Sequence, residues 1–261
     1  MSAAVPGWPG VAASAALVVL TLAVARRGRL GLGRDIAVAA VRAAFQLAAV
    51  GAVLLLVFRH TGLAGALGWV ALMVLVAGRV AARRSGGLPG TYRTATAAVA
   101  VGTTASMGTL LALGIIATEA RVVIPVGGMV VSGAIQATDL ALTRIHDEVR
   151  TARPAVEARL SLGLAAGEAF APHQRVSVRT ALLPVLDSAR TLGVIALPGA
   201  MTGLILAGVD PLTAIRYQIV VTYMLLAAAC LAAVVAARLT ERALFDDAHR
   251  LRPLPEERAP S

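Results

Sequence analysis

A small set of polar and sulfur-bearing side chains lies inside long apolar stretches of this sequence. A charge or an amide in hydrocarbon is costly unless it has a partner, so such residues either pair with one another or line a route for ions and polar solutes. The chemistry they could do is the binding and passage of a cation or small polar solute across a membrane. The candidates are Arg42, Gln46, Met129, Gln136, Asp139, Asp187 and Gln218.

Arg42 is the only arginine well inside an apolar stretch. It follows Ile36 by about 9 Å at the helical rise of about 1.5 Å per residue, deep enough that an unpaired guanidinium would cost several kcal/mol. One interpretation is a buried pair with Asp139 or Asp187. The other is that the long Arg42 side chain reaches back to the headgroups.

The amides of Gln46, Gln136 and Gln218 have two interpretations as well, as hydrogen-bond partners between helices or as pathway lining. The methionines within apolar stretches could fill gaps in the core or act as soft metal ligands. They are Met107, Met129, Met201 and Met224. The four histidines lie outside these stretches, so the residues that would hold a metal remain unknown.

The elements that must position these residues are membrane-spanning helices. The chain of 261 residues is 58% hydrophobic and 15% charged, which leaves too little polar surface for a soluble domain. Blocks of about 20 apolar residues match a hydrocarbon core of about 30 Å. We predict an all-α, polytopic protein with about seven spans, at Val11 to Ala25, Ile36 to Phe58, Leu63 to Gly78, Ala95 to Ala117, Val122 to Ala141, Leu192 to Ala207 and Tyr217 to Ala237.

The arginines predict the orientation of these spans. Twenty of the 24 basic residues lie in the first, third and fifth connecting segments and after the last span, against three in the even segments. Because basic residues collect on the cytoplasmic side, we predict an N-terminus outside and a C-terminus inside, in the inner (cytoplasmic) membrane of a cell.

The predicted membrane domain covers residues 1–241, and residues 242–261 form a short, disordered cytoplasmic tail. The longest hydrophilic connection, residues 142–190, is cytoplasmic in this topology and has room for two short helices. The first opens at Pro154 and places Val156, Leu160 and Leu164 on one face. The second follows Pro172.

Composition also excludes several activities. All basic residues are arginine, so a phosphate-binding loop of the GxxxxGK[ST] type is absent and the chain does not hydrolyse ATP by itself. The net charge is +10, but the basic residues lie between apolar blocks and have no cluster of aromatic residues beside them on which bases could stack. This pattern is atypical of nucleic-acid binding. The single cysteine, Cys230, rules out an internal disulfide or a CxxC metal site.

Several linked motifs resemble those of the FetB-type permeases, bacterial membrane subunits of ABC transporters linked to iron export, with plant relatives linked to aluminium tolerance. They are LSLG at Leu160 to Gly163, LDSARTLG at Leu186 to Gly193, LPGAMTG at Leu197 to Gly203, LAGVDP at Leu206 to Pro211 and AIRYQIVVTYMLL at Ala214 to Leu226. Weaker matches are RAAFQL at Arg42 to Leu47 and IPVGGM at Ile124 to Met129. Where the family is expected to carry Gly-Asn, this sequence has Ser132 and Gly133, which removes a possible pathway amide.

The resemblance implies a permease that exports iron or another metal ion and assembles as a homodimer with two copies of a separate ATPase, which binds ATP and magnesium. It implies a coupling role for Glu157, Leu160, Leu162 and Gly163 at the ATPase contact. This short helix could instead lie on lipid headgroups. The cargo could also be a nucleotide-sugar or another small solute, and the protein could instead be an ion-coupled secondary transporter.

Within LPGAMTG, Pro198 lies in the middle of the predicted sixth span, and Gly199 and Gly203 form a GxxxG pair. These residues predict a helix that bends at Pro198 and approaches a neighbour closely. Such a helix could move during transport, or it could be a static packing seam.

Overall fold

The structure is a computed structural model of the whole chain and describes residues 7–60, 62–84, 88, 90–246 and 248–252. The side chains of residues 8, 55, 56 and 58–60 are also outside the description. The chain divides into two units, residues 1–62 and residues 63–261. We describe each unit by itself.

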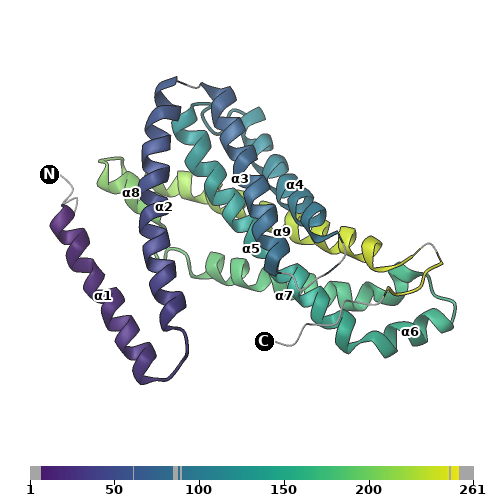
Figure 1. The fold of residues 1–261 in the computed structure, drawn as a ribbon. Coiled ribbons are helices and arrows are strands. Elements are labelled where there is room, and N and C mark those ends of the chain that lie inside the picture. The colour runs from purple at the N-terminus through teal and green to yellow at the C-terminus, as the bar shows by residue number, and fades with distance from the viewer. Residues whose placement is uncertain (1–6, 61, 85–87, 89, 247, 253–261) are drawn as a thin grey trace. The chain divides into compact units, whose positions relative to one another are not determined.

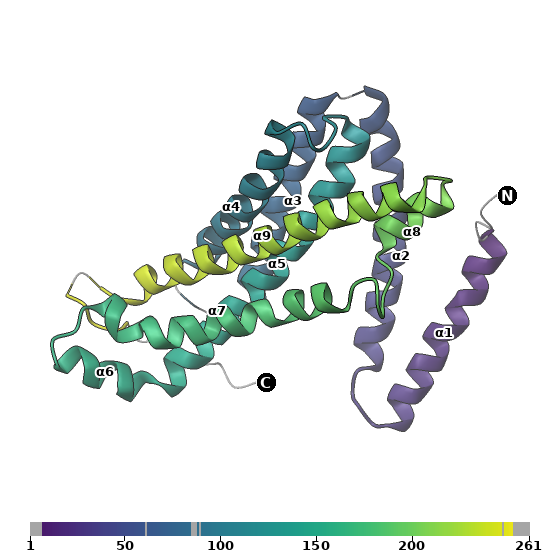
Figure 2. The ribbon, with the colours of Figure 1, turned by 180° about the vertical axis from the view of Figure 1, so that it is seen from behind.

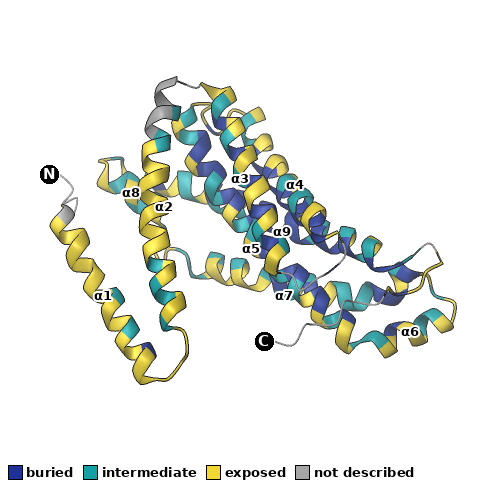
Figure 3. Ribbon diagram, viewed as in Figure 1, coloured by how far each residue is buried: buried dark blue, intermediate teal, exposed yellow. Residues whose placement is uncertain are grey.

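The first unit is a hairpin of two helices, α1 (Trp8–Arg27) and α2 (Gly33–His60). They correspond to the first two predicted spans and are joined by a turn in which Arg29 and Gly31 have positive φ angles of 50° and 70°. Figure 3 shows that both helices present mostly exposed side chains within this unit. Apolar side chains such as Leu17 and Phe45, 66% and 74% exposed, are suited to hydrocarbon surroundings.

The second unit is built on four long helices, α3 (Leu63–Arg84), α4 (Thr91–Ala112), α5 (Ala120–Thr151) and α9 (Pro211–Leu244). Among the described residues, six helices, these four with α1 and α2, are long and apolar enough to cross a membrane. Helix α4 ends earlier than predicted, because Gly114, with a φ of 66°, turns the chain. Helices α5 and α9 run in the same general direction (Figures 1 and 2).

Small residues allow these helices to pack closely. A Cβ atom at Gly102 of α4 would lie 2.6 Å from the carbonyl oxygen of Ala228 on α9. Around this contact α9 buries a stripe of alanines, among them Ala229, Ala232 and Ala233. Close backbone approach is the usual basis of helix association in membranes, where burial of apolar surface gives little driving force.

The predicted sixth span, Leu192 to Ala207, is wrong. Residues 192–198 form a turn with Gly193 at a φ of 80°, and only the eight residues of α8 (Gly199–Leu206) are helical. Eight residues span about 12 Å, too short for a bilayer. Because α5 and α9 run the same way, the chain between them must return, and α7 (Ala166–Thr191) followed by α8 makes that return.

The connection at residues 142–190 is therefore more ordered than predicted. Helix α5 continues to Thr151, the short α6 (Arg153–Ser161) follows, and α7 is 26 residues long rather than short. The break expected at Pro172 does not occur, since α7 contains both Pro172 and Pro184. Helix α7 packs on both α5 and α9, with its buried residues between Ala166 and Ala181, and this packing offsets the lost backbone donors.

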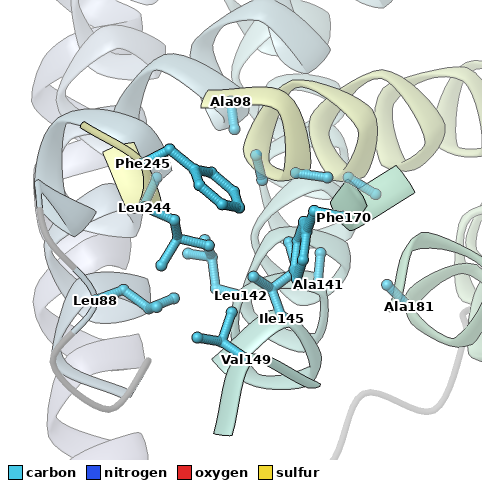
Figure 4. Packing of buried hydrophobic residues seen from close by; sticks show 14 of the residues in the cluster. Leu88, Ala98, Ala141, Leu142, Ile145, Val149, Phe170, Ala181, Leu244 and Phe245 are labelled. Carbon is cyan, nitrogen blue, oxygen red and sulfur yellow. The ribbon is translucent and has the colours of Figure 1, made fainter. Parts of the chain in front are cut away.

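The predicted disordered tail also needs correction, as far as the structure describes it. Residues 242–244 complete α9, and Phe245 and Leu251 are each only 7% exposed. Both belong to a core cluster with Phe170, Leu244 and Val149, which Figure 4 shows from close by. The tail beyond residue 252 lies outside the described residues.

Candidate functional site

The second unit contains a cavity of about 840 Å³ between α5, α7 and α9. Three predicted residues, Met129, Gln136 and Asp139, lie along one side of α5 and line it together. The remaining lining residues are Pro125, Gly128, Ser132, Gly133, Ala137, Leu140, Thr143, Ala181, Pro184, Val185, Ser188 and Leu225. The cavity therefore has a largely apolar wall with hydroxyl, amide and carboxylate groups along it.

Asp139 is the charged residue among the lining side chains. Its Oδ2 atom accepts a hydrogen bond from the guanidinium of Arg84, at the end of α3, over 3.2 Å. Its Oδ1 atom is buried and has no hydrogen-bond partner among the described residues. Oδ1 has almost no accessible surface, so Asp139 contributes negative charge to the cavity wall rather than a free oxygen for a hydrated cation.

Gln136 lies one helical turn before Asp139, and its Nε2 atom donates to the hydroxyl of Ser132 over 3.3 Å. Ser132 and Gly133, where the resembling family is expected to carry Gly-Asn, both line the same wall. A Cβ atom at Gly133 would make an ordinary contact of 3.5 Å with Leu225. The wall could thus hold a larger side chain here, and its absence widens the cavity.

A smaller cavity of about 220 Å³ adjoins the first and shares Met129, Val185, Ser188 and Leu225 with it. Gln218 of α9 lies in its wall, with Nε2 donating to Thr222 over 3.3 Å. Its Oε1 atom is buried without a partner among the described residues. Polar acceptors thus continue from α5 across to α9.

Asp187 lines neither cavity. Asp187 forms an exposed pair with Arg190 on the same helix at 3.1 Å. Arg42 and Gln46 are exposed on α2 of the first unit, so the pairing of Arg42 stays a prediction. The carboxylate of Asp139, one of its two expected partners, is already bonded to Arg84.

The residues expected to bend a spanning helix, Pro198, Gly199 and Gly203, lie instead at the start of the short helix α8 and within it. Pro198 is the residue before the first turn of α8 and does not interrupt a helix. Gly199 and Gly203 are exposed, and a Cβ atom at either would meet nothing within 4 Å. The close helix contact predicted for this GxxxG pair is therefore not made within the described part of the chain, although Pro198 and Gly199 line the smaller cavity.

The predicted coupling residues lie on or beside α6. Val156 is fully buried, and Leu160 and Leu164 pack against the core cluster. Glu157 is exposed and forms an ion pair with Arg153 at 2.7 Å, while Leu162 is 80% exposed. Gly163 has a φ of 87° and ends the helix in a conformation that favours glycine.

Three residues contribute to the site although the sequence did not indicate a role for them there. Arg84 was counted only as a topological charge, while Thr143 and Ser188 gave no signal above ordinary polar residues. Arg84 was detectable in principle, because α3 and α5 place a cation and a carboxylate near the same end of their spans. Among the described residues, no three His, Cys, Asp or Glu side chains gather as a metal site would require.

These features define a multi-pass, all-α membrane protein with a cavity between its helices whose largely apolar wall carries several polar side chains. The model of the uncharacterised protein family UPF0014 matches residues 8–245, and the chain belongs to that family.

Its relatives come from plants and bacteria. The chain is 38% identical to the UPF0014 membrane protein STAR2 of Oryza sativa subsp. japonica, over 92% of this chain and 84% of that protein. It is 35% identical to the probable iron export permease protein FetB of Escherichia coli strain K12, over 90% of this chain and 91% of that protein. It is 34% identical to the protein ALUMINUM SENSITIVE 3 of Arabidopsis thaliana, over 91% of this chain and 88% of that protein. No solved structure matches the chain.

Proposed function

We propose that this protein is the membrane-spanning subunit of an ATP-driven transporter and that α6 couples it to a separate ATPase. The observation that carries the proposal is the position of α6 in the chain. It is joined to α5 through Ala152 alone and to α7 through residues 162–165, and α5 and α7 form two walls of the large cavity. A displacement of α6 would therefore act on both walls.

The packing of α6 suits this role. A coupling element must move with the membrane helices rather than hang loosely from them. Val156 and Leu160 fix one face of α6 to the core, and Arg159 donates to the carbonyl oxygen of Ala169 at 3.4 Å, which ties α6 to α7. Leu162 and Glu157 remain exposed for a groove of the partner, as helix-in-groove recognition requires.

For the cargo we propose iron or another metal ion, moved outward. The support is the similarity to FetB, a probable iron export permease, together with the carboxylate charge of Asp139 and the oxygens of Gln136 and Ser132 in the cavity. Carboxylate, amide and hydroxyl oxygens suit hard or hydrated cations. The volume of about 840 Å³ favours a second candidate, a small organic solute, because it falls in the range of ligand pockets.

The assembly we propose is a homodimer with two ATPase copies in the cytoplasmic membrane. ATP and magnesium would bind to the ATPase, because this chain has no lysine with which to build a phosphate-binding loop of the usual type. Closure of the ATPase pair would press on α6 and change the access of the cavity.

The test is co-purification of the solubilised chain with a candidate ATPase encoded beside it, followed by ATP hydrolysis with and without ferrous iron. We expect a stable complex and iron-stimulated hydrolysis. Glu157→Lys and Leu162→Asp should each weaken the complex. Glu119→Lys should not, because Glu119 lies at the N-terminal end of α5, whereas α6 follows its C-terminal end. A complex indifferent to iron would favour the organic solute, and transport without any ATPase would favour a secondary transporter.

A further inference from the structure

The described residues after α9, 245–246 and 248–252, fold back into a closed turn, which we call the C-terminal turn. Phe245 and Leu251 face each other in an antiparallel bridge, and both are buried in the core cluster. The backbone N–H of Arg252 donates to the carbonyl oxygen of Leu244 over 2.8 Å. In Figure 4 the Phe245 ring lies beside Leu244 over the cluster that contains Ile145 and Leu142. The turn is therefore anchored at both ends.

Asp246 holds the turn closed. Its carboxylate accepts hydrogen bonds from the backbone N–H groups of Ala248 and Arg250, at 3.0 and 2.8 Å, and from Nε of Arg250 at 2.8 Å. The bond from the backbone of Arg250, supported by its guanidinium, lowers the pKa of Asp246 below its ordinary value of 3.8. Asp246 is therefore ionised at neutral pH, as an aspartate of ordinary pKa already is, and these bonds persist there.

The C-terminal turn and α6 enclose a groove of about 500 Å³. One wall comes from α6 and the residues after it, and the other from the turn. The lining residues are Glu157, Leu160, Ser161, Leu164, Ala248, His249, Arg250 and Leu251. The α6 wall includes Glu157, which the proposed function assigns to the ATPase contact, so the turn borders that surface directly.

The exposed charge of the turn indicates what fits beside it. Asp246 occupies one edge of the Arg250 guanidinium, but the Arg250 side chain is 79% exposed. Because a guanidinium has five N–H donors, Arg250 can bind a second acceptor. Arg242 and Arg252 are exposed nearby in sequence. A surface that docks here needs carboxylates opposite these arginines and an apolar pocket for Leu162.

We propose that the C-terminal turn is the second half of the ATPase docking surface, with an acidic side chain of the ATPase bound to Arg250 beside the groove. This inference rests on the proposed function. It differs from a lipid-binding role, in which the same arginines would contact anionic headgroups.

The first experiment compares Arg250→Glu with Arg121→Glu, a matched charge reversal near the opposite end of α5. In full-length protein in nanodiscs, we expect Arg250→Glu to weaken ATPase binding at least tenfold and Arg121→Glu to leave it unchanged. Wild-type affinity in Arg250→Glu, with binding lost in Leu162→Asp, would overturn the role of the turn and leave the proposed function standing. Failure of the wild-type chain to bind any ATPase would overturn both.

The second experiment needs no disruptive change. Cys230 is the single cysteine, so Ala248→Cys in a Cys230→Ser background places one thiol on the exposed rim of the turn. We expect the ATPase to slow maleimide labelling at residue 248 several-fold, and anionic lipid in the nanodisc to have no such effect. Labelling that the ATPase leaves unchanged, or that anionic lipid alone slows, would overturn the proposal.

Discussion

Asp139 combines a carboxylate, a cation partner and a position in the cavity wall. We predict that Asp139→Asn reduces iron-stimulated ATP hydrolysis by the intact complex on the order of tenfold, because the cavity loses its lining carboxylate. The fold should change little. The Arg84 side chain is 65% exposed, so solvent or lipid headgroups can contact its guanidinium once the Asp139 charge is removed.

Asp187→Asn is the matched control for this prediction. It also removes a carboxylate paired to an arginine, at 3.1 Å, but Asp187 is 63% exposed and does not line the large cavity. Its hydrolysis rate should stay within about twofold of wild type. Equal loss in the two variants would assign the effect to general electrostatics rather than to the cavity.

At the scale of elements, the contact between α4 and α9 depends on the missing side chain of Gly102. We predict that Gly102→Val destabilises the protein by about 1–3 kcal/mol, because its side chain would collide with the backbone of Ala228 and force the helices apart. Thermal unfolding in detergent should show a lower midpoint. Gly108→Val, on the same helix where a Cβ meets nothing within 4 Å, should unfold like wild type.

The arrangement of α6, α7 and α8 is the other feature at this scale. A single spanning helix at Leu192 to Ala207 would have separated the coupling loop from the cavity. Instead α7 extends from the turn after α6 into the cavity wall at Ala181 to Ser188, so one rigid element joins the two candidate sites. The second half of this return is the turn at 192–198 followed by α8, and α8 packs on α9.

For the whole molecule, the arginine distribution predicts which end of the second unit faces the cytoplasm. In a Cys230→Ser background, we expect Ala117→Cys, in the α4–α5 connection, to react with a membrane-impermeant maleimide added to intact cells. Ala158→Cys, on α6, should react only after the cells are permeabilised. The reverse pattern would place α6 outside and remove the ATPase-coupling proposal.

The sequence alone determined the membrane class and six of the spans, and it named three residues of α5 that line the large cavity. It could do so because these depend on local quantities. Apolar length must match the bilayer, and Met129, Gln136 and Asp139, which share one side of a regular helix, keep that relation in any fold. The motifs likewise identified the family, because the order and spacing of motifs can be compared without knowledge of how the helices pack.

Only the tertiary structure decided the rest. Residues 192–207 are as apolar as a span, yet the chain turns at Gly193, with a φ of 80°, and only the part after Pro198 is helical. Arg84 meets Asp139 across 55 residues, and Leu251 reaches the core beside Phe170 from a segment that reads as polar. Contacts between distant residues are set by how helices pack, and neither hydropathy nor helical period records that packing.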